Sequence, residues 1–252
     1  MKRTLLLAWL QIVEAVRTRW LPAVCALSLI VCFVYLGVLA RDGRLARDAE
    51  RVFSAVDELV VGFGVWTGFL LAWTHGGSWY DRGVRSGSLV FTVLRPGPRR
   101  TVLMGGWLGS LAATAGPVFV GALVFSGVSA FFLVGPTNLW IQVIGVIPGL
   151  ALWTAAFVVG PLLVSRATTA GIVVLLIFGS AVAPWMAQTL GGGLGNVLLY
   201  LQPPVLPVLL SQGPAPDAAR AAAEIAYQVC GTVLLLIAGS RRFERMELLE
   251  RR

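Results

Sequence analysis

Six apolar runs, each close to the length of a membrane-spanning helix, limit the fold of this chain more than any other feature of its sequence. A helix needs about 20 mostly apolar residues in succession to cross the hydrocarbon core of a bilayer. The runs cover Trp20–Ala40, Leu59–Tyr80, Gly109–Leu133, Ile141–Val164, Thr168–Ala187 and Ala221–Gly239. They predict an all-α integral membrane protein in which six transmembrane helices form a single bundle.

The overall composition supports this class. Charged residues make up 13% of the 252 positions and hydrophobic residues 57%, whereas a soluble domain carries about 25% charged residues. Polar groups are therefore too few to cover a soluble globule. The net charge of +8 does not indicate a nucleic-acid-binding protein, because the arginines gather at the ends of apolar runs and form no stripe with exposed aromatic residues.

Some parts of the sequence depart from a series of upright helices. The apolar stretch 102–134 is too long for one upright helix, so we expect a shallow approach segment before the third span begins at Gly109. Pro148 and Pro161 are expected to kink the fourth span. Residues 191–217, between the fifth and sixth spans, contain short apolar pieces interrupted by prolines. They predict a re-entrant hairpin, which is stable only where protein buries its backbone.

The distribution of basic residues predicts the orientation of the chain. Fifteen of the 20 lysines and arginines lie in the amino-terminal segment, the connections between spans two and three and between spans four and five, and the carboxyl-terminal tail. By the positive-inside rule, the side that carries these residues faces the cytoplasm. We therefore predict a multi-pass protein of the cell inner (cytoplasmic) membrane with both termini in the cytoplasm.

Residues 1–19 are predicted to form an amphipathic helix in the inner interface. Gln11, Glu14 and Thr18 fall away from an apolar face that recurs at helical spacing, formed by Leu5, Trp9, Ile12, Val13, Val16 and Trp20. The apolar run is too short for a signal peptide, and no small-residue cleavage site follows it. The alternative is a cytosolic extension of the first span. Residues 20–240 then form the six-span bundle and residues 241–252 a cytoplasmic tail.

The sequence lacks the residues that a P-loop, a serine-type catalytic site or a metal site would require. The only lysine is Lys2, which excludes a P-loop, and the only histidine is His75, which has no serine motif or metal-binding motif around it. The cysteines lie inside apolar runs as small apolar fillers, so no metal site is predicted; they are Cys25, Cys32 and Cys230. No charged residue lies near the centre of a predicted span. We therefore expect no enzyme, and any uphill transport requires another subunit.

The connection between the second and third spans contains a basic segment, residues 81–100. A short helix at Ser88–Leu94 is predicted to end at Pro96, because the residue before a proline is steered away from the helical conformation. The spacing of Gly87-Ser88-Leu89, Pro96 and Arg99 resembles the G-[ST]-L…P-x-x-R signature of ABC type-2 permeases, the membrane subunits of ATP-driven exporters. On charge alone, a basic loop that only sets the topology is the better explanation of the segment.

The resemblance implies how such a chain would be powered. In that family this segment forms a coupling helix that docks into a separate ATPase subunit. The interfacial amino-terminal helix, the six spans and the broken region before the last span are similar as well. A single transmembrane permease domain over residues 1–252 is implied. It would assemble as a homodimer in preference to a heterodimer, with two ATPase subunits that bind ATP and Mg, and it would hold no cofactor itself. The implied coupling residues are Gly87, Ser88, Leu89, Phe91, Leu94, Arg95, Pro96 and Arg99.

The predicted spans offer few polar groups to orient a hydrophilic solute, so we expect an amphipathic or lipid-like substrate. Candidates for its path are Trp66, Thr67, Trp107 and Trp153, and interface anchoring or helix packing is the competing explanation for the tryptophans. A second hypothesis keeps the same fold as a non-transporting anchor, which transmits force from the ATPase to an extracytoplasmic partner through residues 41–58.

Small residues recur every four positions in two of the runs. They form the stripes Gly64-xxx-Gly68 and Gly105-xxx-Gly109-xxx-Ala113. Stripes of this kind permit helices to approach closely, either inside one bundle or at a dimer seam.

Overall fold

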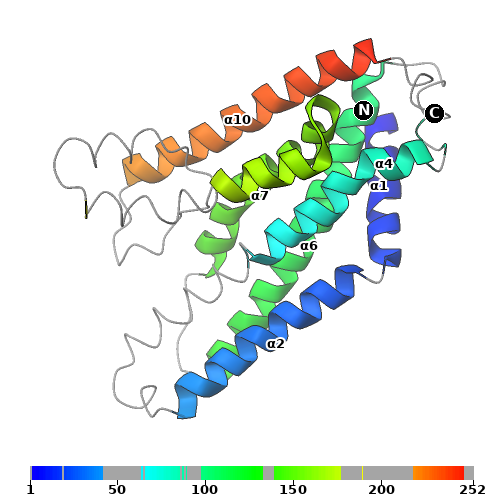
Figure 1. The fold of residues 1–252 in the computed structure, drawn as a ribbon. Helices are drawn as coiled ribbons and strands as arrows, with labels where there is room; N and C mark the ends of the chain where they lie inside the picture. The colour runs from blue at the N-terminus through cyan, green and yellow to red at the C-terminus, as the bar shows by residue number, and fades with distance from the viewer. Residues whose placement is uncertain are drawn as a thin grey trace.

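The computed structural model describes residues 2–18, 20–41, 64, 66–85, 87, 89, 98–132, 139–176, 189 and 218–246. Every regular element in these ranges is helical, which confirms the predicted all-α class for the described part of the chain. The elements are α1 (Lys2–Arg17), α2 (Trp20–Arg41), η2 (Ala72–Gly76), α4 (Gly77–Arg85), α6 (Arg100–Phe132), α7 (Leu139–Leu163) and α10 (Ala218–Arg245). A shorter apolar helix, Arg166–Leu176, follows α7. Figure 1 shows α1 at the end of the bundle where α4 and α10 finish, turned away from the direction shared by α2 and α6.

Three helices in the described ranges are long and apolar enough to cross a membrane. They are Arg100–Gly121 in α6, Val146–Leu163 in α7 and Ala222–Arg245 in α10. These helices indicate a membrane protein. The predicted re-entrant hairpin at 191–217 lies outside the described residues, and so do parts of the second and fifth spans. The count of six spans therefore stays a prediction.

The third predicted span begins earlier than its sequence indicated. α6 is one continuous helix from Arg100, with Pro117 inside it, so the separate approach segment expected before Gly109 is wrong as a secondary-structure assignment. The first turns of α6 carry Val102 and Leu103, and both side chains are buried among residues of α4, α7 and α10. Protein covers the apolar side chains of these turns. They therefore belong to the packed helix bundle and do not indicate a separate segment along the membrane surface.

The central core joins the helix that contains η2 to α6 and α7. Phe69 packs edge-on against Trp153, with ring centroids 6.0 Å apart, and against Phe157 at 5.7 Å. A Cβ added at Gly68 would lie 2.2 Å from Cδ2 of Leu150, which is far closer than two carbon atoms pack. The first small-residue stripe is thus used for packing inside this subunit.

A tight turn joins α7 to the next helix. Both Pro148 and Pro161 lie inside α7, which ends at Leu163. The hydroxyl of Ser165 accepts a hydrogen bond from the backbone N–H of Thr168 at 3.1 Å, as an N-cap residue does. This turn brings Arg166 back to the end of the bundle where α4 ends.

Candidate functional site

The candidate site is the end of the bundle formed by α4, the start of α6, the end of α7 and the end of α10. We call it the basic end, because it carries Arg82, Arg85, Arg99, Arg100, Arg166, Arg242 and Arg245. Beneath these arginines lies one buried apolar cluster, made of Trp79, Tyr80, Leu89, Val102, Leu103, Val158, Leu162 and Phe243. Four helices and the start of the basic segment 81–100 therefore meet in one cluster.

The basic segment turns back onto α4 at Gly87. This glycine has φ 71, a left-handed conformation that residues with a Cβ adopt at a cost. Its N–H donates to the carbonyl oxygen of Val84 at 3.1 Å. Leu89 then packs over Gly83, where an added Cβ would lie 3.0 Å from the Cβ of Leu89. Since Leu89 is only 5% exposed, its side chain anchors the segment to α4.

The other end of the segment is fastened to α10. Nη1 of Arg99 donates hydrogen bonds to the carbonyl oxygens of Glu244 at 3.2 Å and Met246 at 2.9 Å. The last carbonyls of a helix have no partner within that helix and carry partial negative charge. A guanidinium at this position both satisfies them and complements the helix dipole. The side chain of the P-x-x-R arginine thus ties the start of α6 to the end of α10.

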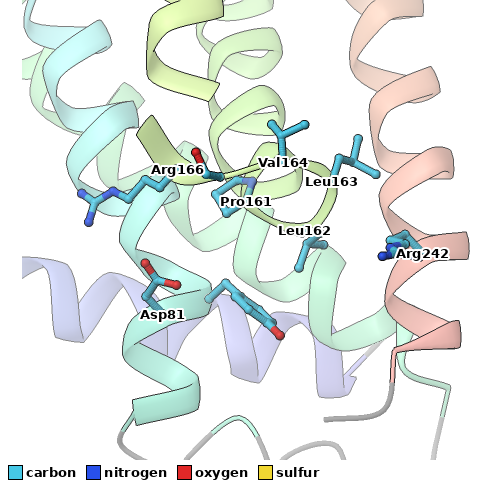
Figure 2. A pocket seen from close by; sticks show the side chains of 9 residues that line it. Asp81, Pro161, Leu162, Leu163, Val164, Arg166 and Arg242 are labelled. Carbon is cyan, nitrogen blue, oxygen red and sulfur yellow. The ribbon is translucent and has the colours of Figure 1, made fainter. Parts of the chain in front are cut away.

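A cavity of about 440 Å³ opens beside these anchors. Its wall is formed by Tyr80 and Asp81 of α4, the 161–166 turn, and Arg242 of α10. Figure 2 shows Asp81 and Arg242 on opposite sides of the apolar turn, with Arg166 above Asp81. The cavity combines an apolar floor with two arginines and one carboxylate.

α1 packs on the second small-residue stripe, that of α6. A Cβ at Gly105 would lie 2.6 Å from the Cβ of Leu7, and one at Gly109 would lie 2.4 Å from the Cβ of Gln11. Only glycine permits this approach, so the stripe holds α1 within the same subunit. Of the two uses predicted for it, packing inside the bundle is the one that the structure contains.

The amphipathic character of α1 explains which side it buries. Ala8, Gln11 and Ala15 are buried, whereas the exposed large apolar side chains are Leu5, Leu6, Trp9, Leu10 and Val16. The small and polar side is thus turned toward protein, and the large apolar side chains are left exposed. Of the predicted apolar face, Leu5, Trp9 and Val16 are exposed, whereas the sequence pattern did not indicate that Gln11 would be covered.

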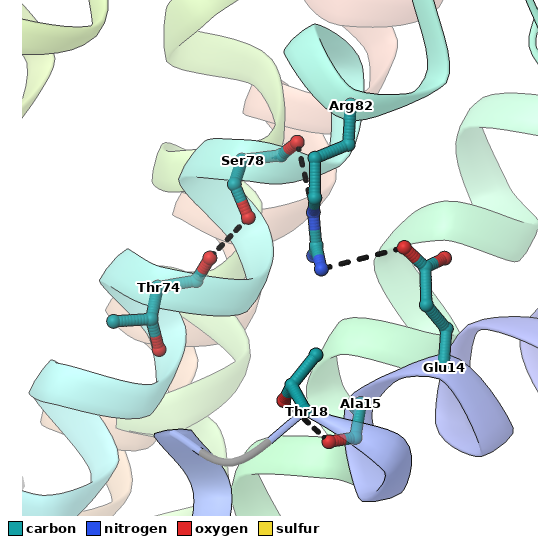
Figure 3. A network of polar contacts seen from close by, with 6 residues as sticks. All are labelled: Glu14, Ala15, Thr18, Thr74, Ser78 and Arg82. Carbon is teal, nitrogen blue, oxygen red and sulfur yellow. Dashed lines mark hydrogen bonds and ion pairs between the residues drawn. The ribbon is translucent and has the colours of Figure 1, made fainter. Parts of the chain in front are cut away.

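An ion pair links α1 to α4. Arg82 lies 3.4 Å from Glu14, and both side chains are partly exposed. Figure 3 shows that Nε of Arg82 also donates to the carbonyl oxygen of Ser78, at 3.3 Å, one turn earlier in the same helix. α1 therefore contacts both helices that flank the basic segment.

The four residues predicted for a substrate path differ widely in exposure. Trp66 is 66% exposed, whereas Thr67 is buried and Trp153 is only 1% exposed. Trp107 donates from its indole nitrogen to the carbonyl oxygen of Ala151 at 3.3 Å, which joins α6 to α7. Helix packing is thus the role that the structure gives to Trp107 and Trp153.

His75, the only histidine of the chain, is enclosed by protein. It lies in the π-helical turn η2 and is 2% exposed. The π-turn is supported by Thr74, whose hydroxyl donates to the carbonyl oxygen of Leu70 at 2.8 Å. No sequence signal distinguished this turn from an ordinary stretch of α-helix.

The remaining predicted coupling residues lie outside the described residues; they are Ser88, Phe91, Leu94, Arg95 and Pro96. Within the described ranges, no group of three or more His, Cys, Asp or Glu residues could hold a metal ion. The chain was also compared with protein-family models and with curated proteins, and it matches none of either.

Proposed function

We propose that this chain is the membrane-spanning permease subunit of an ABC type-2 exporter, placed in the cytoplasmic membrane with both termini in the cytoplasm. Two copies would assemble with two ATPase subunits, which bind ATP and Mg. This chain is then not an enzyme and carries no cofactor. The proposal rests on the resemblance of Gly87-Ser88-Leu89, Pro96 and Arg99 to the coupling signature, together with the contacts of the described residues among them.

The observation that carries the proposal is the fastening of the basic segment at both ends. Leu89 holds the part of the segment that follows α4 against that helix. Arg99 holds the end of the segment on the last carbonyls of α10. A push applied between these two residues reaches α4, α6 and α10 together. A loop that only sets topology needs basic side chains but needs neither anchor.

The amino-terminal helix belongs to the same mechanical unit. It packs on Gly105 and Gly109 of α6 and pairs with Arg82 of α4 through Glu14. In our proposal, displacement of the basic segment moves α1 together with α4, α6 and α10, relative to the rest of the bundle. That movement would switch the bundle between inward-open and outward-open arrangements.

The proposed cargo is amphipathic or lipid-like. The polar side chains in the described spans are scattered, and the hydroxyls of Thr114 and Thr154 donate to carbonyl oxygens one turn earlier in their own helices. Such side chains do not form a binding constellation for a hydrophilic solute. The second candidate is a non-transporting anchor that transmits force to an extracytoplasmic partner. In this candidate too, an ATPase subunit would dock on the basic segment.

The test asks whether an ATPase binds through residues 88–98. Affinity-tagged chain, purified from its own host membranes in mild detergent, is expected to bring with it vanadate-sensitive ATP hydrolysis. Phe91→Asp and Leu94→Asp are expected to abolish that activity. Phe53→Asp is the matched control, because it makes the same change in the connection predicted for the opposite side of the membrane.

The outcomes separate the candidates. Wild-type chain recovered without associated ATPase activity, or equal activity in Phe91→Asp and Phe53→Asp preparations, would overturn the proposal. Reconstitution of the complex in vesicles then tests export. ATP-dependent movement of a fluorescent lipid analogue supports the exporter, whereas robust ATP hydrolysis without such movement favours the anchor.

A further inference from the structure

Two side chains in the interior of the bundle carry polar atoms that have no hydrogen-bond partner in the part of the chain that the structure describes. They are His75, with both ring nitrogens unpartnered, and Ser110, with its hydroxyl unpartnered. His75 is 2% exposed and Ser110 is fully buried. A buried polar group without a partner costs free energy, so proteins satisfy nearly all such groups with protein atoms or with ordered water.

The hydroxyl of Ser110 differs from the other hydroxyls near it. Thr114, one turn later in α6, donates to the carbonyl oxygen of Ser110 at 2.8 Å. Thr74 donates in the same way to the carbonyl oxygen of Leu70, and Figure 3 shows Ser78 donating to the carbonyl oxygen of Thr74. Serine and threonine side chains inside helices often bond to their own backbone in this manner. Within the described ranges the Ser110 hydroxyl makes no such bond, so it is left for a partner outside α6.

The register between α6 and the helix that contains η2 brings Ser110 and His75 to the same level. A Cβ added at Gly106 would clash with the indole ring of Trp79, so the two helices touch at this point. Glycine contacts earlier in the helix of η2 fall later in α6, so the two helices run antiparallel. Ser110 lies one turn after Gly106, and His75 lies one turn before Trp79. Because residues four apart share one face of a helix, the two unpartnered side chains lie on facing sides of this contact.

We propose that His75 and Ser110 bind one buried water molecule between η2 and α6. A buried water is held by roughly two to four polar groups. A neutral imidazole has one N–H donor and one acceptor nitrogen, and a serine hydroxyl both donates and accepts. Water also donates and accepts, so it bridges the hydroxyl to a ring nitrogen in either tautomer of the imidazole. The inference concerns the packing of the bundle, so it holds or fails independently of the proposed export function.

The test is hydroxyl-radical footprinting of the full chain in detergent, in which X-rays split water where it lies and mass spectrometry identifies the oxidised side chains. A side chain closed to solvent is oxidised only if a bound water contacts it, so His75 is expected to be oxidised in spite of its burial. Phe157 is the internal control, because it is fully buried, packs beside Gly76 and has no polar side-chain atom to bind water. Ser110→Ala is expected to lose most of the His75 oxidation. Thr114→Val is the matched control variant, since it removes a hydroxyl that is already bonded within α6, and it is expected to leave that oxidation unchanged.

Three results would overturn the proposal. If His75 stays unmodified in the wild-type chain, no water contacts it. If Phe157 is oxidised as fast as His75, bulk solvent enters the bundle and the label does not report a bound water. If His75 is oxidised equally in Ser110→Ala and Thr114→Val, Ser110 does not hold the water. The wild-type comparison of His75 with Phe157 needs no substitution, so it decides the matter even if Ser110→Ala is poorly folded.

Discussion

The contact between α1 and α6 allows a sharp test at Gly109. An alanine at this position would bring its Cβ within 2.4 Å of the Cβ of Gln11 and 2.8 Å of the backbone oxygen of Ala8. Neither atom is the flexible end of a side chain, so the whole of α1 must move away by about 1 Å to reach an ordinary carbon–carbon distance. Overpacking of this kind costs about 1–3 kcal/mol.

The same substitution seven residues later provides the control. An added Cβ at Gly116 meets nothing within 4 Å, and both glycines lie inside α6. Replacing a helical glycine by alanine stabilises a helix by about 1 kcal/mol where no clash occurs. Gly116→Ala is therefore expected to be neutral or stabilising, whereas Gly109→Ala gains the same helix propensity but is expected to be less stable than Gly116→Ala by about 1–3 kcal/mol.

The assay is thermal unfolding of the purified variants in one detergent, combined with hydrogen exchange of peptides from residues 2–17. Gly109→Ala is expected to unfold at a lower temperature than Gly116→Ala and to exchange faster throughout α1. Equal unfolding temperatures and unchanged exchange in α1 would refute the inference that this small-residue stripe holds the amino-terminal helix.

Further predictions concern the two ends of the basic segment and its side of the membrane. Arg99→Ala removes the bonds to the last carbonyls of α10 and is expected to cost about 1 kcal/mol and to speed hydrogen exchange there; Arg100→Ala is the control, and equal exchange in both variants counts against the anchor. Gly87→Ala forces a Cβ into a left-handed conformation, so chemical or thermal unfolding is expected to show a loss of about 1 kcal/mol. In a background without the native cysteines, Pro96→Cys and Phe53→Cys are expected to react with a membrane-impermeant maleimide from opposite sides. Labelling of both from one side contradicts the predicted orientation.

Much of the helical framework is readable in the sequence. The first apolar run predicts Trp20–Ala40, and α2 covers Trp20–Arg41. The fourth predicts Ile141–Val164, and α7 covers Leu139–Leu163. These agreements arise because the length of an apolar run and the charges that end it are local properties of the chain, and lipid requires a helix wherever such a run occurs.

The turn chemistry is only partly readable. The sequence identifies Gly87 as a possible turn residue. It does not show that the left-handed conformation of Gly87 returns the chain so that Leu89 packs on Gly83. The basic character of Arg99 is equally visible, whereas its partners Glu244 and Met246 lie more than 140 positions away. No local pattern connects residues so far apart.

The sequence by itself determined that this chain is helical and largely apolar, where several of its helices run, and which residue types gather at the basic end. Only the tertiary structure decided that Gly105 and Gly109 receive α1, that Leu89 is buried, and that Trp107 and Trp153 pack between helices. The physical reason is that lipid and protein interior are both apolar. Hydrophobic periodicity therefore shows that a side chain avoids water without showing whether lipid or another helix covers it.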